Sequence, residues 1–492
     1  MDLDKNVHRL LKEIGPNKSL MTNTAYDTAW AARLKALDHP IGEQALEWLR
    51  EHQLADGSWG ANELPYYHDR LICTLAAMIV LVKYGRGLDH VRWQRGQLAL
   101  QAATKGLKVD MSGDTIGFEM IVPTLWAEAE SLGIVQAQES DLLNQLARQR
   151  AAKLAALPGG MINRFVTVAF SAEMAGPDGL HLLDVENLQE INGSVGHSPS
   201  ATAYFAMYVR PRDPSALKYL HQTVSQGGVP TVAPSDVFEM GWVLWNLALT
   251  GSLDDETLAL CRPHLDFIQS IWDPGQGIPQ ASGYTPRDSD DTSLVYEAFS
   301  RFGRPMSLDA ILHYEEDDYF RCFALEANPS ISANIHVLGA LRQGGLEVEH
   351  PSVIKVIQYL FNSQALQLFW FDKWHVSPYY PTAHAIIAGT GYVDWLVDGA
   401  AYWILETQKS DGSWGYYVST AEETAYCLQA LVMWRRHGHP VPDDVLKRGA
   451  AWLARRTEQP YPPLWIGKCL YCPVRVVRST ILSALMLAAQ EV

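Results

Sequence analysis

The stretch Gln53-Leu-Ala-Asp-Gly-Ser-Trp-Gly60 recurs near the other end of the chain as Gln408-Lys-Ser-Asp-Gly-Ser-Trp-Gly415. Each copy follows a helical pattern, over 45–52 and 400–407, and precedes an acidic residue and a second apolar helical pattern. Asp-Gly is a strong turn signal, and the tryptophan behind it can wedge two helices apart. The repeat therefore predicts a helix–turn–helix unit in which the Asp-Gly-Ser-Trp-Gly turn is architectural.

Looser copies of this unit fill the chain between the two stretches, and new helices begin about every 40–55 residues. Patterns typical of strands are nearly absent. Helical hairpins of this period either stack as an open solenoid or close into an α/α-barrel. Because the inner helices are apolar on all sides, closed barrels with buried inner rings are favoured. There are more hairpins than one barrel holds, so the sequence predicts an all-α chain with two α/α-barrel domains.

Composition and targeting signals narrow the functional classes. The chain has 492 residues, is 48% hydrophobic and carries a net charge of -16, which argues against binding to nucleic acid or to an anionic membrane surface. The N-terminus has no signal-peptide pattern, and the longest apolar run, 71–82, is too short for an integral membrane segment. The pair Cys469-x-x-Cys472 has no second ligand pair at zinc spacing. We expect a reduced, cytoplasmic protein.

The sequence Asp288-Ser-Asp290-Asp291 places three carboxyl groups within four positions, directly before an apolar helical pattern that Gly303 ends. Asp288 is a good helix N-cap. Like charges this close raise one another's pKa, as does a low dielectric, so one carboxyl group can stay protonated at neutral pH and act as a Brønsted acid. The alternative is an ordinary N-cap with first-turn acids that the helix dipole favours.

The chain contains 16 tryptophans, and aromatic side chains recur at the expected inner ring. Aromatic faces stabilise cations without acting as nucleophiles, and exclusion of water prevents a cation from being quenched. A barrel with such a lining and one protonated acid is typical of carbocation chemistry. Packing in the core is the alternative for each candidate. The candidates are Trp370, Trp374, Tyr379, Tyr380, Trp414 and Trp465.

Taken together, these residues resemble the class II terpene cyclases, and specifically bacterial diterpene cyclases of the copalyl, halimadienyl (tuberculosinyl) and kolavenyl diphosphate synthase type. The resemblance covers essentially the whole chain and is greatest to the halimadienyl type. The acid cluster matches the family's DxDD motif. Other matching stretches are Tyr26-Asp-Thr-Ala-Trp30, Gly117-Phe-Glu119, Ser198-Pro-Ser200, Gly227-Gly-Val-Pro230, Asp372-Lys-Trp374 and Trp465-Ile-Gly-Lys-Cys-Leu-Tyr471.

The resemblance implies a βγ architecture. We expect a γ-like barrel over 26–244 and a β-like barrel over 245–492 that carries the acid cluster. An N-terminal segment, 1–25, is expected to join the β-like barrel. The active site should lie between the two barrels.

The resemblance also implies catalytic roles. Asp290, the middle acid, would protonate the terminal alkene of a polyprenyl chain, and Asp288 and Asp291 would hold its geometry and proton affinity. His336 matches a position that hydrogen-bonds the acid in plant relatives, whereas a buried core imidazole is its alternative. Tyr471 joins Trp370, Trp374, Tyr380 and Trp414 as an expected lining residue of the cavity.

The other end of such a substrate carries a diphosphate, which needs cations. Lys153 and Lys373 match lysines near the diphosphate in plant relatives, and Lys468 is a further candidate. Mg²⁺ would bridge the phosphates through oxygen ligands. The region that matches the family's magnesium motif contains Asp110, Asp114 and Glu119, in a degenerate form.

The sequence departs from the plant pattern at the base that ends the reaction. Phe170 and Thr231 stand where plant ent-copalyl synthases have a histidine and an asparagine. Without that base, hydride and methyl shifts are favoured, so we expect a rearranged skeleton of halimadienyl or kolavenyl (clerodane) type. Tyr471 or His336 could take the final proton, and the sequence does not choose between them.

The expected reaction is cyclisation of geranylgeranyl diphosphate with the diphosphate retained, because the acidic run 315–318 lacks the spacing of a metal-dependent ionisation motif. A separate downstream enzyme would then remove the diphosphate. The alternatives within the family are an unrearranged copalyl product and a drimenyl diphosphate synthase that acts on farnesyl diphosphate. An α/α-barrel glycoside hydrolase, with Glu239 or Glu423 as its second acid, is the alternative from another class. The sequence does not give the oligomeric state.

Overall fold

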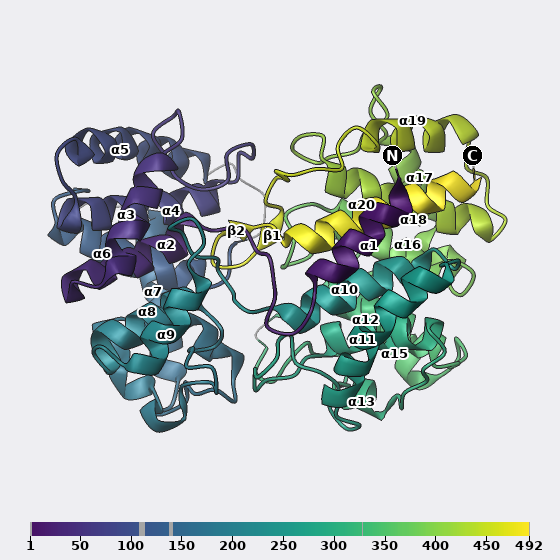
Figure 1. The fold of residues 1–492 in the computed structure, drawn as a ribbon, viewed down its shortest axis with the longest axis horizontal. Coiled ribbons are helices and arrows are strands. Elements are labelled where there is room, and N and C mark those ends of the chain that lie inside the picture. The colour runs from purple at the N-terminus through teal and green to yellow at the C-terminus, as the bar shows by residue number, and fades with distance from the viewer. Residues whose placement is uncertain (1, 108–113, 137–140, 327, 492) are drawn as a thin grey trace.

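The computed structural model describes residues 2–107, 114–136, 141–326 and 328–491. Figure 1 shows two helical lobes, with a short β-hairpin between them. Each lobe has its own buried apolar core. This confirms the predicted all-α chain with two α/α-barrels. No helix of the described part is both long and apolar enough to cross a membrane.

The inner segments of the first barrel contact one another in a closed ring. They are α2 (Ala25–Ala32), α4 (Tyr67–Tyr84), α6 (Phe118–Ser131), the 3₁₀ segment Thr167–Ala175 and α8 (Pro199–Tyr204). The outer helices that pack on this ring are α3 (Pro40–Glu51), α5 (Asp89–Gly106), α7 (Asp141–Ala156) and α9 (Pro214–Thr223). Short 3₁₀ or π segments cover Arg33–Leu37, Pro177–Leu182, Val185–Asn187 and Phe205–Val209.

The second barrel closes in the same way. Its inner ring consists, in order around the ring, of α10 (Asp236–Leu249), α12 (Ser289–Arg301), α14 (Ile331–Gln343), α16 (Tyr379–Gly389), α18 (Ala421–Arg436) and α20 (Val474–Glu491). The outer layer consists of α1 (Leu3–Glu13), α11 (Asp255–Ile271), α13 (Asp309–Leu312), α15 (Pro351–Asn362), α17 (Asp394–Glu406) and α19 (Asp443–Leu453).

The two Asp-Gly-Ser-Trp-Gly turns have the same geometry. The Trp59 indole donates to the carbonyl of Leu49, and that of Trp414 donates to the carbonyl of Ile404, at 2.7 Å in both cases. Gly412 has a φ of +93°, and a Cβ there would lie 2.6 Å from the carbonyl oxygen of Arg448. Only glycine therefore fits this position. The turn locks an outer helix to the next inner helix, which confirms its architectural role.

The hairpin of β1 (Trp465–Ile466) and β2 (Leu470–Tyr471) joins the two barrels. Its tip inserts into the first barrel, where the backbone N–H of Leu470 donates to Asp69 at 2.8 Å and Ile116 donates to the carbonyl of Gly467 at 2.9 Å. A small apolar cluster with members from both barrels, including Tyr66 and Val376, packs around it. The hairpin therefore fixes the surface at which the two barrels meet.

The division of the chain differs from the predicted boundaries at one point. Helix α1 packs on α20 and α11, within the second core, where the N-terminal segment 1–25 was expected. The predicted boundary between 244 and 245, however, falls inside α10. Val237, Met240 and Trp242 of this helix belong to the second core, because α10 closes the ring between α12 and α20. The second barrel therefore begins at this helix, before the predicted position.

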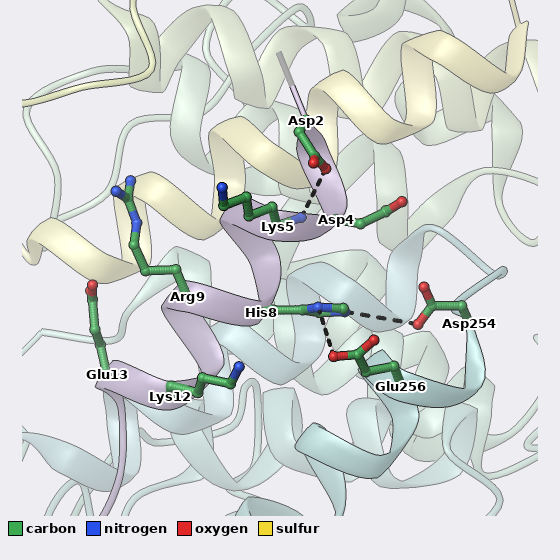
Figure 2. Close-up of a pocket in the computed structure, with 9 residues that line it drawn as sticks. All are labelled: Asp2, Asp4, Lys5, His8, Arg9, Lys12, Glu13, Asp254 and Glu256. Atoms are coloured by element: carbon green, nitrogen blue, oxygen red, sulfur yellow. Dashed lines mark hydrogen bonds and ion pairs between the residues drawn. The ribbon is translucent and has the colours of Figure 1, made fainter.

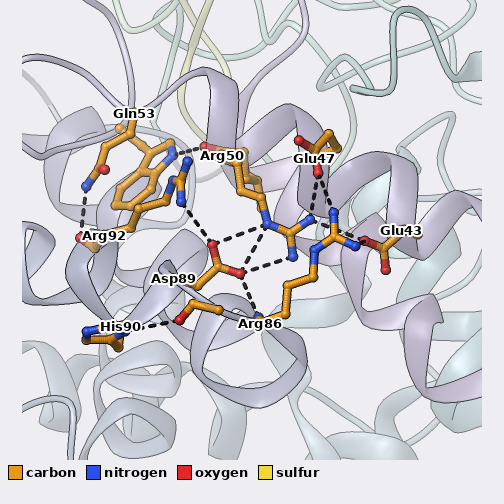
Figure 3. A network of polar contacts seen from close by, with 11 residues as sticks. Glu43, Glu47, Arg50, Gln53, Arg86, Asp89, His90 and Arg92 are labelled. Carbon is orange, nitrogen blue, oxygen red and sulfur yellow. Dashed lines mark hydrogen bonds and ion pairs between the residues drawn. The ribbon is translucent and has the colours of Figure 1, made fainter.

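Figure 3 shows a charged network that ties the outer helices of the first barrel together. The side chain of Arg50 on α3 is 6% exposed and donates to both carboxylate oxygens of Asp89 on α5, at 3.1–3.2 Å. It also pairs with Glu47 at 2.8 Å and Glu43 at 3.2 Å. Because each buried charge has opposite partners, the network positions helices and offers no free group for chemistry.

Candidate functional site

The acid cluster lies at the N-terminus of the inner helix α12. The Asp288 carboxylate caps the helix by accepting the backbone N–H of Asp291 at 2.7 Å, as the sequence predicts. Asp290 and Asp291 follow in the first turn. The side chain of Asp290 is 20% exposed, whereas Asp291 is buried. Of the two acids in the first turn, Asp290 is therefore the one that can meet a substrate.

Burial and mutual repulsion keep protons on this cluster. Burial, reinforced by the charge of Asp290, raises the pKa of Asp288 to about 7, although the N–H of Asp291 opposes the shift. Burial, followed by the charges of Asp288 and Asp290, raises the pKa of Asp291 well above its ordinary value. The titrations of Asp288 and Asp291 therefore depend on each other. The structure thus raises the pKa of two carboxyl groups next to Asp290, and Asp290 as the protonated acid stays a prediction.

His336 on α14 contacts this acid directly. Its Nδ1 lies 2.6 Å from Oδ1 of Asp290, and its Nε2 lies 2.9 Å from Nδ1 of His384 on α16. Burial lowers the pKa of His336, but the charge of Asp290 and the hydrogen bond to it outweigh burial and raise it overall. For His384, burial and the neighbouring His336 lower the pKa well below its ordinary value. The pKa values of the two imidazoles are therefore shifted in opposite directions: protonation is favoured on His336 and disfavoured on His384.

Aromatic rings surround this histidine pair. The Trp242 ring lies 5.6 Å from His336 and 5.6 Å from Trp465, and the Tyr380 ring lies 4.9 Å from His384. Beyond them, the Trp465 indole N–H donates to the buried carboxylate of Glu422 at 2.7 Å. The result is a continuous aromatic layer beside Asp290, and aromatic faces of this kind stabilise cations.

Several members of this layer are absent from the residues singled out in the sequence. They are Trp242, His375, His384 and Glu422. Trp242, His384 and Glu422 come from three different helices of the ring, and His375 lies in the segment before α16, so no local motif marks the group. One sequence signal could have found part of this group: two polar or aromatic side chains one turn apart on a helix that is otherwise apolar on all sides. Tyr380 and His384 on α16 are such a pair.

The predicted lining residues fall into two groups. Trp370 and Trp414 are turn wedges: each is fully buried and donates its indole N–H to the preceding outer helix, Trp370 to Leu360 at 2.8 Å. This corrects the predicted contact of both with a cation. Tyr380 belongs to the aromatic layer, and Trp374 lies under the ammonium of Lys373, 4.8 Å from the ring centre.

Tyr471 lies on β2, directly before the start of α20. Burial, followed by the charge of Asp291, raises the pKa of its phenol. At neutral pH it is a neutral hydroxyl near the acid cluster.

The predicted diphosphate-binding lysines occupy different environments. Lys373 pairs with Glu326 and donates to the carbonyl of Asn328 at 2.5 Å, and its side chain is 28% exposed. Lys153, which is 55% exposed, pairs with Glu119. Both can exchange these partners for a phosphate.

Lys468 is fully buried at the tip of the hairpin. Its ammonium group donates to Glu173 at 2.6 Å and to Ser198 and Ser200 at 2.7 Å. All three donors are occupied, and the ring of Phe170 lies 4.4 Å away. This arrangement gives Lys468 a structural role between the barrels in place of the predicted phosphate contact. The prediction failed because burial at this position depends on the insertion of the hairpin.

The predicted magnesium ligands lie near the start of α6. Asp110 is outside the described residues. The Asp114 carboxylate is 62% exposed and lies 2.8 Å from Nε2 of His68, and Glu119 holds Lys153. Asp114 and Glu119 are hard oxygen donors of the kind that Mg²⁺ prefers. They fit an ion that takes its other ligands from a diphosphate and water.

At the predicted base positions, neither side chain is basic. Phe170 lies against the Lys468 ammonium. The hydroxyl of Thr231 is buried and has no hydrogen-bond partner among the described residues.

Two pockets are candidate substrate sites. The larger, of about 740 Å³, lies on the surface between α1 and the start of α11, and charged side chains such as Lys12, Glu13 and Glu256 line it. Figure 2 shows the ring of His8 at its wall, in contact with Asp254 and Glu256. Its polar walls do not suit a polyprenyl chain. The smaller, of about 270 Å³, runs between the barrels beside the acid cluster.

The smaller pocket has the better chemistry for a prenyl diphosphate. Its lining includes Phe165 of the first barrel and Phe323 of the second, together with Arg287 and Arg321. Phe323 also lies 5.5 Å from the Lys373 ammonium. The pocket thus combines aromatic and cationic groups next to Asp288.

Known proteins share the sequence and fold of this chain. A model of the squalene-hopene cyclase C-terminal domain matches residues 322–460. A type B diterpene cyclase of Mycobacterium tuberculosis is 46% identical over 484 residues, which are 96% of this chain and 96% of the relative. An ent-copalyl diphosphate synthase of a Streptomyces species is 33% identical over 90% of this chain and 88% of the relative.

A solved structure extends the likeness to three dimensions. The ent-copalyl diphosphate synthase from Streptomyces platensis superimposes with a TM-score of 0.78 at 29% identity, over 99% of this chain and 100% of that one. These matches confirm the resemblance seen in the sequence and do not favour the glycoside hydrolase alternative. The chain therefore belongs to the class II diterpene cyclases, enzymes of the intramolecular isomerase type.

Proposed function

We propose that this cyclase converts geranylgeranyl diphosphate to a bicyclic prenyl diphosphate and retains the diphosphate group. The observation that carries the proposal is the contact of Asp290 with His336, at 2.6 Å, beside an aromatic layer. It joins a proton donor to a surface that stabilises cations. The relatives named copalyl diphosphate synthases support a prenyl diphosphate as the substrate.

The chemistry follows from the positions of these groups. Asp290 gives its proton to the terminal carbon–carbon double bond, and the two inner double bonds attack the resulting cation in turn to form two rings. The faces of Trp242, Tyr380 and Trp465 stabilise the charge while it moves. Loss of a proton from the bicyclic cation forms a new double bond, so the product is an isomer of the substrate. Asp290 must then be reprotonated.

The diphosphate needs cations at the other end of the site. Lys373 and Lys153 are the candidates, because both are partly exposed and each pairs with one carboxylate. Mg²⁺, held by Asp114 and Glu119, would neutralise charge on the phosphate oxygens. Because the diphosphate stays on the product, a separate enzyme that removes it must act next.

The product skeleton is proposed from two residues. Phe170 and Thr231 cannot take a proton from the first bicyclic cation, so hydride and methyl shifts can proceed. We therefore favour a halimadienyl or kolavenyl skeleton over an unrearranged copalyl one. Tyr471 and His336 remain the candidates for the final proton acceptor.

The test is product analysis by mass spectrometry after incubation with geranylgeranyl diphosphate and Mg²⁺ and treatment with phosphatase. We expect the wild type to give a bicyclic diterpene alcohol, and Asp290→Asn to give only geranylgeraniol. Asp317→Asn, at an exposed loop position, is the matched control and should behave as the wild type. A product from farnesyl diphosphate alone would favour the drimenyl alternative. Unchanged cyclisation by Asp290→Asn would refute Asp290 as the acid.

The proposed phosphate contacts have a separate test. Lys373→Ala and Lys153→Ala should raise KM by about tenfold each, the size of one lost charged hydrogen bond, with a smaller effect on kcat. Lys218→Ala removes an exposed lysine of the first barrel and should leave KM unchanged. Equal KM values in all three variants would remove these lysines from the proposal.

A further inference from the structure

His384 is a buried histidine for which the reaction outlined above has no use. It lies one turn after Tyr380 on the inner helix α16 and is 1% exposed. Its Nδ1 lies 2.9 Å from Nε2 of His336, and the opposite nitrogen of His336 contacts Asp290. The three side chains thus form a line that starts at the catalytic acid and ends inside the barrel wall.

The direction of the hydrogen bonds follows from the chemistry of the acid. A carboxyl group that donates its proton to His336 cannot give the same proton to an alkene. His336 must therefore donate to Oδ1 of Asp290, which leaves the acidic proton on Oδ2. If His336 is charged, its Nε2 also carries a proton, and that N–H needs an acceptor inside the barrel.

His384 is placed to be that acceptor. Nδ1 of a neutral imidazole accepts when the proton is on Nε2. In the described part of the chain, Nε2 of His384 has no hydrogen-bond partner, so nothing forces the other tautomer. The His384 ring stacks on Trp245 at 4.9 Å with an interplanar angle of 13° and is also in contact with Trp242. This packing fixes the ring so that Nδ1 faces His336.

On this geometry, and on the basis of the proposed function, we propose that His384 is a positioning residue that holds His336 as an imidazolium and thereby strengthens Asp290 as an acid. A charged His336 stabilises the Asp290 carboxylate that remains after proton transfer. Without an acceptor at Nε2, a buried imidazolium would lose its proton. His384 would then contribute to the rate without touching the substrate.

The other ionisable groups around this line fit the same charge state. Asp290 and the buried Glu297 face His336 from α12, and Asp372 adds a more distant negative charge. Around His384 the neighbours are the rings of Tyr380 and Tyr426, with His375 nearby. Carboxyl groups thus lie on the side of His336, and aromatic rings lie on the side of His384.

The kinetic test compares two substitutions of the same residue. His384→Leu removes the acceptor and should lower kcat by about 10²-fold, the lower range for general acid catalysis, with KM nearly unchanged. It should also move the alkaline limb of the kcat profile down by about one to two pH units, because His336 loses its proton earlier. His384→Asn offers an amide oxygen near the place of Nδ1 and should recover most of the loss.

A matched control separates this effect from general damage. His264 on α11 is a partly buried histidine in the outer layer of the same barrel, and it contacts the carbonyl of Leu11 at 2.9 Å. His264→Leu should change melting temperature without moving the pH limb. An unshifted limb in His384→Leu, or no recovery in His384→Asn, would overturn the positioning role.

A direct measurement does not depend on turnover. In protein labelled with ¹⁵N only in histidine, with His336→Gln used for assignment, both ring nitrogens of His336 should be protonated at pH 7 in the wild type, and the ring should be neutral in folded His384→Leu. A neutral His336 in the wild type, or a charged one in the variant, would contradict the inference. A charged wild-type His336 without turnover of geranylgeranyl diphosphate would instead count against the proposed substrate alone.

Discussion

Both barrels bury carboxyl groups on their inner segments, but the two sites balance the charge differently. In the first barrel, Asp27 and Glu173 are fully buried around the ammonium of Lys468. In the second, Asp290, which lies between Asp288 and Asp291 in the sequence, contacts the imidazole of His336. A lysine holds its charge over the whole physiological range, whereas an imidazole does not.

This difference in the cation distinguishes the structural cluster of the first barrel from the acid cluster that we propose for catalysis in the second. Glu173 accepts hydrogen bonds from Tyr26, Ser200 and Lys468 on one oxygen, whereas its other oxygen has no hydrogen-bond partner among the described residues. Burial raises the pKa of Asp27 in the first cluster and of Asp288 and Asp291 in the second. The two clusters therefore differ in their cation: an ammonium group holds the first, and an imidazole contacts the second.

The largest expected effect comes from removal of the lysine in the first cluster. Lys468→Met keeps the length of the side chain but leaves Glu173 buried without its counter-ion, which should cost about 3–5 kcal/mol of folding free energy. The measurement is denaturant unfolding followed by circular dichroism. Lys409→Met, at a partly buried position on the surface of the second barrel, is the control and should change little. A variant as stable as the wild type would mean that Glu173 is already neutral.

The second cluster should respond to pH where the first does not. Asp288 carries a proton below its pKa of about 7 and loses it above, and burial raises the pKa of Asp291 as well. We therefore expect kcat to fall as pH rises above about 7, by up to about tenfold per pH unit. The measurement is the initial rate between pH 5 and 9 at saturating substrate. A flat profile to pH 9 would contradict a proton shared within the cluster.

The burial of Asp291 should itself lower stability. The pKa of Asp291 in the folded chain lies well above the ordinary value of 3.8. Above about pH 4 the unfolded chain therefore loses this proton while the folded chain keeps it. The stability of the wild type consequently falls as pH rises. Asp291→Asn removes this penalty, and it should be more stable than the wild type by about 1–2 kcal/mol at pH 8. The advantage should shrink toward pH 4, and cyclase activity should fall.

Thermal melting at pH 4, 6 and 8 checks this prediction. Asp273→Asn, in an exposed turn before α12, serves as the control for a substitution of the same type. If Asp291→Asn were less stable than the wild type at pH 8, the carboxylate would have to be ionised and paired.

The same contrast explains which parts of the molecule could be predicted from sequence. The repeated turn, the barrels and the capping of α12 by Asp288 depend on local patterns, and these predictions were correct. Asp290 was singled out in the same way, because its neighbours in sequence are its neighbours in space, and its role as the acid stays a prediction. His384, Trp242 and Glu422 come from three other helices of the ring, so only the closed barrel brings them together.

For Lys468, the sequence motif was recognised, but the environment expected from it differs from the one that the structure shows. A lysine between two glycine-rich or apolar stretches is compatible with a phosphate site, and its sequence carries no sign of a carboxylate almost 300 residues away. The contact with Glu173 exists only because the hairpin enters the first barrel. A local sequence pattern therefore cannot predict burial that arises only where two domains meet.

The smallest effect is expected from removal of both charges in the first cluster. If the role of Lys468 and Glu173 is purely structural, the double variant Lys468→Met with Glu173→Gln should recover most of the stability that Lys468→Met loses. Its free energy of unfolding should come within about 1 kcal/mol of the wild-type value, because a neutral pair of similar size replaces the ion pair. Its kcat should match the wild type, since neither side chain belongs to the acid cluster. The equivalent neutral pair in the second barrel, Asp290→Asn with His336→Gln, should be inactive even if it is equally stable. A double variant of the first cluster that folds well but binds geranylgeranyl diphosphate at least tenfold more weakly would return Lys468 to the phosphate site, because loss of a single charged contact has about that size.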